Sequence, residues 1–214
     1  MAGLAALGDD RPGRIVLVGH SAGAVFIDNL LEATRKARQE GRLPADFAYE
    51  GVLFLAPACT FADFARVLPR DGEPPLFRQF RMFTMDDDHE RTDRLVSVVY
   101  PRSLLYFVSG VVEREDDGKN AFDMPLVGME RYYARDTSTR DVYEDLGDEM
   151  RTVREFVLTG PRTVWSVTGA DALPGFRSDS ISHGGFDDTG TVGDTPVPRA
   201  TIDSVRHILE AGWD

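Results

Sequence analysis

The stretch Ile15–Gly23, which reads IVLVGHSAG, decides the fold that this sequence predicts. Its first four residues are all apolar, a pattern typical of a parallel strand covered on both faces. From Ala22 onward, apolar residues recur at helical spacing, and Gly41 stands where such a helix would end. The stretch therefore predicts a strand, a sharp turn and a helix in direct succession.

A second apolar run and two further candidate strands follow along the chain. They are Val52–Leu55, Phe80–Met85 and Thr163–Thr168. The helical segment between the first two strands makes a β-α-β unit, which joins parallel strands. We therefore expect one α/β domain over residues 1–214, with a parallel sheet of about four strands flanked by helices.

The segment between the third and fourth strands is longer than a simple helical crossover needs. We expect residues 90–160 to form a helical, lid-like insertion within the domain. One helix would start at Pro101 and a second would span Glu144–Leu158. The apolar residues Leu104–Phe107 either line a substrate pocket or pack into the core.

The two ends of the chain have weaker patterns. A short helix is expected at Ala2–Leu7. The segment Gly184–Pro198 is rich in Gly, Asp and Thr and is predicted to be a loop, while Ala200–Ala211 has the apolar spacing of a closing helix.

Charge and composition exclude several classes of protein. Asp and Glu outnumber Lys and Arg 36 to 24, giving a formal net charge of −12, which repels nucleic-acid phosphates and anionic lipid. No apolar stretch reaches the roughly 18 uncharged residues that span a bilayer. The only cysteine, Cys59, lies in an apolar run and is expected to be a buried, unreactive thiol. We expect a cytoplasmic protein with no nucleic-acid partner.

The turn after the first strand has the pattern Gly-x-Ser-x-Gly, formed by Gly19, His20, Ser21, Ala22 and Gly23. A serine in such a turn adopts a strained backbone that projects its hydroxyl from the strand end. The two glycines would remove side chains that clash there. We expect Ser21 to be a nucleophile; the alternative is a tight turn with a structural role only.

This strand, turn and helix resemble those of the α/β-hydrolase superfamily, in which the chain order is nucleophile, acid, histidine. The resemblance covers the layout of nearly the whole chain, but only the turn is specific in sequence. It implies a serine hydrolase built on the second half of that fold, with the Ala22 amide donating to the developing oxyanion. We expect neither a cofactor nor a metal.

A serine hydroxyl needs a base, and histidine has a suitable pKa. His183 follows the fourth strand in the loop SHGGF, where the resembled family places its histidine. The other three histidines are His20 in the turn, expected to point away from the serine, His89 in an acidic cluster and His207 on the closing helix. We expect His183 to be the base, against a loop histidine with no catalytic role.

The acid that orients the base should stand at a neighbouring strand end. Asp86, Asp87 and Asp88 follow the third strand, in the family's usual position for the acid. We favour Asp87, then Asp86. Asp171, in a turn after the fourth strand, is the rival, and an acid outside both groups is the remaining alternative.

Two acidic clusters contain residue types that bind hard metal ions. They are Asp86–Glu90 and the group Asp187, Asp188 and Asp194. Neither has the ligand spacing of a known site, so we expect solvated acidic loops.

Only twenty residues precede Ser21, whereas the resembled family places four strands and the second oxyanion amide before it. The strand Ile15–Val18 would then be an apolar sheet edge, to be covered by a missing N-terminal half or by a second copy in a homo-oligomer. We expect hydrolysis of a small ester-type substrate through an acyl-enzyme. The alternative is a truncated, weak or inactive module that associates through this strand.

Overall fold

The computed structural model describes residues 14–93, 103–112, 124–133, 147–187, 189–192 and 195–213. The strands of its main sheet are β1 (Val16–His20), β2 (Tyr49–Leu55), β3 (Phe77–Met85) and β4 (Thr163–Ser166). The α-helices are α2 (Ala22–Gln39), α3 (Phe61–Val67), α4 (Asp87–Thr92), α5 (Leu104–Phe107), α6 (Gly147–Leu158) and α7 (Ala200–Glu210). Shorter elements are η1 (Val108–Val112), η2 (Glu130–Tyr132), η5 (His183–Phe186) and the hairpin β5 (Thr189–Val192) and β6 (Thr195–Pro198).

The main sheet has the order β1-β2-β3-β4, and every neighbouring pair is parallel. In the first pair Val16 lies opposite Gly51 and His20 lies opposite Leu55. The predicted α/β fold with a four-stranded parallel sheet is confirmed. Because all four strands run the same way, their carboxyl ends share one edge of the sheet, and Ser21 lies at that edge.

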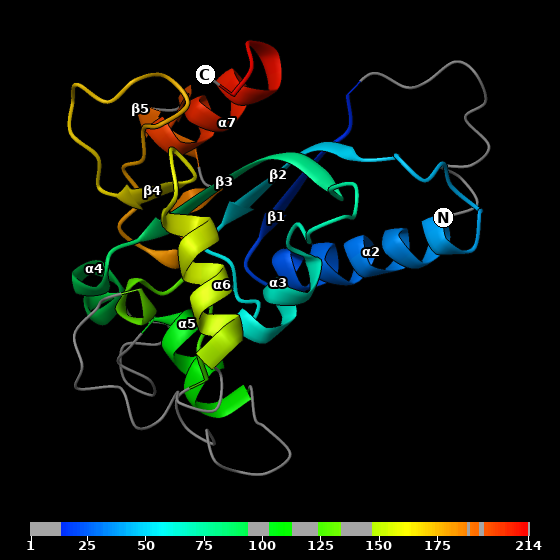
Figure 1. Ribbon diagram of the computed structural model, residues 1–214. Coiled ribbons are helices and arrows are strands. Elements are labelled where there is room, and N and C mark those ends of the chain that lie inside the picture. The colour runs from blue at the N-terminus through cyan, green and yellow to red at the C-terminus, as the bar shows by residue number, and fades with distance from the viewer. Residues whose placement is uncertain are drawn as a thin grey trace.

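Helices cover both faces of the sheet, with α2, α3 and α6 on one side and α7 on the other (Figure 1). Alternate residues of β2 divide between the two layers. Val52 and Phe54 pack with the first group of helices, and Leu53 and Leu55 pack with α7. Cys59 is fully buried, as expected from the apolar run that contains it.

The acidic run after β3 is a helix and not the solvated loop that its composition predicts. Asp86 is the N-cap of α4, because its side chain accepts from the His89 N–H (2.8 Å). Carboxylates are favoured in a first helical turn, where the free N–H groups leave positive potential. Further along that helix, Glu90 is fully buried.

The predicted loop Gly184–Pro198 also contains regular structure, namely most of η5 and the antiparallel pair β5 and β6. The prediction counted Thr with Gly and Asp as typical of a loop, whereas Thr and Val also favour strands.

Within the expected insertion, α5 begins after Ser103, which caps it, rather than at Pro101. Leu105 and Tyr106 belong to the core, so of the two alternatives for this helix the structure supports packing into the core. Pro101, the segment Ala2–Leu7 and the start of the predicted helix at Glu144 lie outside the described residues. Among the residues that the structure describes, no helix has the length and apolar character to cross a membrane.

Candidate active site at the turn between β1 and α2

Ser21 is the single residue between β1 and α2, and its backbone conformation is one that L-residues rarely adopt. Its φ is +53° and its ψ is −118°. Such a conformation costs on the order of 1–3 kcal/mol and persists only where the surroundings hold it. The Ser21 N–H donates to Leu55 O (2.9 Å), and the Ser21 carbonyl accepts from the Ala58 N–H (3.2 Å). The turn therefore stores strain at the serine predicted to be the nucleophile.

The two glycines of the turn have different roles. A Cβ at Gly19 would lie 2.7 Å from Ile27 Cδ1 and 2.8 Å from the Gly23 carbonyl carbon, so no side chain fits there. A Cβ at Gly23 would meet nothing within 4 Å. The prediction that both glycines remove clashing side chains is correct for Gly19 and wrong for Gly23, because Gly23 faces open space.

Ala22 is the first residue of α2 and is exposed. The N–H groups of a first helical turn have no intrahelical acceptor, and they lie at the positive end of the helix dipole. An oxyanion that develops on a group bound to Ser21 can therefore be stabilised by the Ala22 amide. The oxyanion role that the resemblance implies for Ala22 stays a prediction.

His183 begins η5 and is only 7% exposed. Neither of its ring nitrogens has a hydrogen-bond partner in the described part of the chain. Burial first, and then the charge of neighbouring His20, lower the pKa of His183 to about 4. The imidazole is therefore neutral near pH 7 and able to accept a proton.

His20 joins the serine turn to the histidine loop. Its Nε2 lies 3.0 Å from the carbonyl oxygen of His183, and the two rings stack with centroids 5.0 Å apart. Because His20 directly precedes Ser21, the structure brings the predicted nucleophile and the predicted base into one region. The proton-transfer hydrogen bond between Ser21 and the His183 ring is not formed in this arrangement, since both ring nitrogens are unpartnered.

The predicted acid, Asp87, has other partners. Tyr106 Oη donates to Asp87 Oδ1 (2.8 Å), and Arg91 forms an ion pair with Asp87 Oδ2 (2.8 Å). The second choice, Asp86, accepts from both the backbone N–H and the ring Nδ1 of His89. Neither carboxylate is hydrogen-bonded to the ring of His183.

The remaining candidate acids, Asp88 and Asp171, are exposed. A third carboxylate does reach the histidine loop, because Asp93 Oδ2 accepts from the backbone N–H of His183 (2.9 Å). Asp187 Oδ2 lies 3.0 Å from His20 Nδ1. Asp93 is a site residue that sequence reasoning missed, and its position shortly after the carboxyl end of β3 is the signal that could have indicated it. Asp187 was considered only as a member of an acidic cluster.

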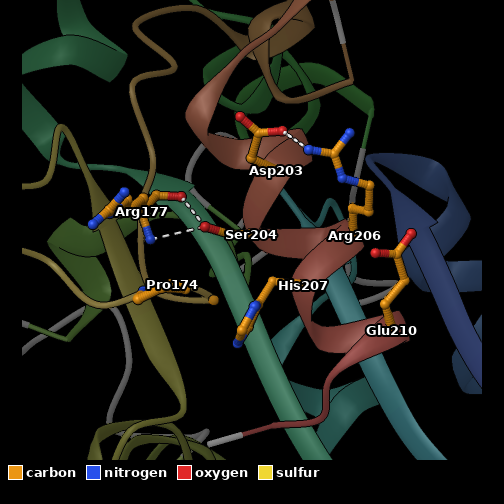
Figure 2. A pocket seen from close by; sticks show the side chains of 8 residues that line it. Pro174, Arg177, Asp203, Ser204, Arg206, His207 and Glu210 are labelled. Carbon is orange, nitrogen blue, oxygen red and sulfur yellow. Dashed lines mark hydrogen bonds and ion pairs between the residues drawn. The ribbon is translucent and has the colours of Figure 1, made fainter.

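Two hollows lined by described residues lie away from this turn. Figure 2 shows one of them, between α7 and residues 174–177, where Arg206 pairs with Asp203 (2.6 Å) and Ser204 bonds to the backbone of Arg177. The other lies between β1 and α7. In the described ranges, no group of three or more His, Cys, Asp or Glu side chains is arranged to hold a metal ion.

No protein-family model, curated protein or solved structure matches this chain.

Proposed function

We propose that this chain is a serine hydrolase that cleaves a small carboxylic-ester-type substrate in the cytoplasm through an acyl-enzyme. The observation that carries the proposal is the left-handed backbone of Ser21 at the junction of a buried parallel strand and an 18-residue helix. Strained residues of this kind concentrate at sites of chemistry, and glycine would occupy the position without strain. A buried, unpartnered His183 beside the same turn is the second support.

The proposed reaction uses three groups of the chain. Ser21 Oγ attacks the carbonyl carbon of the ester while His183 accepts the hydroxyl proton, for which the imidazole turns from its present orientation toward Ser21. The negative charge that develops on the carbonyl oxygen lies at the N-terminus of α2, near the Ala22 amide. The alkoxide leaves with the proton from His183, and an acyl group remains on Ser21.

Water completes the cycle. His183 removes a proton from a water molecule as it attacks the acyl-enzyme, and the proton then returns to Ser21 Oγ as the carboxylic acid leaves. Asp93 holds the backbone of His183, so we assign it, in preference to Asp87, the role of fixing the base. We also propose that the domain is the second half of an α/β-hydrolase fold, with residues 90–160 as a lid.

Hydrolysis of p-nitrophenyl acetate and p-nitrophenyl butyrate tests the proposal. We expect release of p-nitrophenol by the folded protein, and a loss of roughly a hundredfold or more in Ser21→Ala and in His183→Gln. Asp71→Asn, at an exposed carboxylate, is the matched control and should keep full activity. Equal rates in the wild-type protein and Ser21→Ala would overturn the proposal.

A second candidate function is association through β1, and a specific observation favours it. β1 ends the sheet order, so one side of its backbone has no strand partner in the described residues. Val18 on β1 is 45% exposed, and Leu209 on α7, which lines the hollow beside β1, is 47% exposed. Apolar strand edges pair readily with further strands, and we commit to a second copy of this chain as the partner.

Light scattering over a concentration series tests this second candidate. A dimer in the wild-type protein and a monomer in Val18→Lys would support it, because a lysine on an edge opposes strand pairing. A wild-type monomer at every concentration would exclude it.

A further inference from the structure

The side chain of His20 faces acceptor atoms at both of its ring nitrogens. Nε2 lies 3.0 Å from the carbonyl oxygen of His183, and Nδ1 lies 3.0 Å from Asp187 Oδ2. His20 itself stands on β1 directly before Ser21. The two contacts therefore fasten the start and the end of the loop 183–187 to the strand that carries the serine.

The chemistry of these two acceptors fixes the charge state that the arrangement needs. A carbonyl oxygen and a carboxylate oxygen accept hydrogen bonds and cannot donate them. A neutral imidazole has a single N–H, whereas an imidazolium has two. Both hydrogen bonds can therefore exist together only while His20 is an imidazolium.

Other described residues also neighbour His20. The ring of His183 stacks on it, Leu55 is its apolar neighbour in the sheet, and the first turn of α2 carries no acidic side chain. Asp187 is a carboxylate in direct contact with the His20 ring, and it is about half exposed.

We propose that His20 is a positioning residue, which as an imidazolium holds the His183 loop against the serine turn. This inference rests on the proposed function, and it adds that the protonation of His20 controls the position of the His183 loop at the same site. The backbone of His183 is then held on both sides, since Asp93 accepts from its N–H and His20 donates to its carbonyl oxygen. The stacked charge also opposes protonation of His183 and keeps the proposed base in its proton-accepting form.

This arrangement predicts that the attachment of the loop 183–187 to β1 depends on pH through the protonation of His20. When His20 loses its second proton, one of the two hydrogen bonds is lost, and the loop is released on that side. A hydrogen bond to a charged group corresponds to roughly a tenfold to a hundredfold change in an equilibrium constant, so we expect the loop to open more often by a factor of that order.

Nuclear magnetic resonance of the full chain tests the proposal without any need for hydrolysis. Ring-nitrogen spectra of protein labelled with [¹⁵N]histidine report when His20 loses its second proton, with His20→Gln used for assignment. We expect the backbone amides of Gly184 and Gly185 to shift in the same pH step, and this step to be absent in His20→Gln. The proposal would be overturned if the chemical shifts of the Gly184 and Gly185 amides do not change when His20 loses its second proton.

The rate at which a fluorophosphonate labels Ser21 provides a second test, because a purely structural role of His20 would not change it. We expect the rate at which a fluorophosphonate labels Ser21 to fall about tenfold in His20→Gln and in Asp187→Asn. We also expect the wild-type rate to fall at the same pH as the loop transition. His207→Gln on α7 is the matched control. The positioning role would be overturned if Asp187→Asn and His20→Gln label at the same rate as the wild-type protein. If the wild-type protein never labels, the proposed function is overturned, and the resonance experiment alone decides the role of His20.

Discussion

The backbone N–H of His183 donates to Asp93 Oδ2 at 2.9 Å, and this bond joins the loop after β4 to the end of the helix after β3. The two residues are ninety positions apart in the chain. The contact places a carboxylate on the backbone of the proposed base, and that carboxylate belongs to a residue other than the aspartate favoured from the sequence.

Substitution of Asp93 should weaken the site more than substitution of Asp87. Asp93→Asn keeps the shape but removes the charge from the bond to His183, so we expect fluorophosphonate labelling of Ser21 to slow by about tenfold to a hundredfold. Asp87→Asn, whose partners are Tyr106 and Arg91, should slow it less. A larger loss of labelling rate in Asp87→Asn than in Asp93→Asn would indicate that Asp87, the residue favoured from the sequence, is the acid.

The buried carboxyl group of Asp28 should make the fold less stable as the pH rises. Burial raises its pKa from 3.8 to about 8, so the folded protein keeps a proton that the unfolded chain releases. The stability that depends on this proton is complete below pH 4 and is lost as the pH rises from about 4 to 8. At about 1.4 kcal/mol for each pKa unit, the loss amounts to several kcal/mol at pH 8.

Asp28→Asn removes that dependence while keeping the size of the side chain. We expect a higher melting temperature than the wild-type protein at pH 8, and a smaller difference at pH 4. The exposed residue Asp71 gives the control Asp71→Asn, which should melt like the wild-type protein at both pH values. A lower melting temperature for Asp28→Asn at pH 8 would show that the ionised carboxylate is stabilising.

At low pH, the rate at which a fluorophosphonate labels Ser21 should fall because His183 becomes protonated. Since burial and His20 lower the pKa of His183 to about 4, protonation of His183 should not slow the labelling until the pH approaches 4. In the free energy of unfolding, the same shift supplies stability that is complete above pH 6.5 and is lost as the pH falls toward 4. In His20→Gln the labelling rate should begin to fall at a higher pH than in the wild-type protein. A wild-type rate that falls with a midpoint near pH 6.5 would contradict the lowered pKa of His183.

The glycines of the turn should respond differently to alanine. A methyl group at Gly19 meets Ile27 and the backbone of Gly23, so Gly19→Ala should lower the free energy of unfolding by about 1–3 kcal/mol. Gly23→Ala enters open space within a helix and should raise it by up to about 1 kcal/mol. Urea unfolding of the two variants measures both effects. Equal destabilisation by the two substitutions would contradict the structure of the turn.

The sequence predicted those parts of the molecule that local patterns control. Two apolar runs and two candidate strands indicated the four parallel strands, and the turn at Ser21 was identified from five adjacent residues. The region around Asp86 was misjudged, because a run of carboxylates resembles a solvated loop, whereas here it supplies a helix cap and the buried Glu90. The contacts of His183 with Asp93 and His20 could not be predicted, because they join distant segments through backbone atoms that carry no sequence signal.

The most direct test of the account is the mass of the chain after reaction with a fluorophosphonate, followed by digestion to locate the adduct. We expect a single adduct on the peptide that contains Ser21, absent in Ser21→Ala and formed at least about a hundredfold more slowly in His183→Gln. Folded protein that gains no adduct, or an adduct that persists in Ser21→Ala, would contradict the claim that the strained serine is the nucleophile.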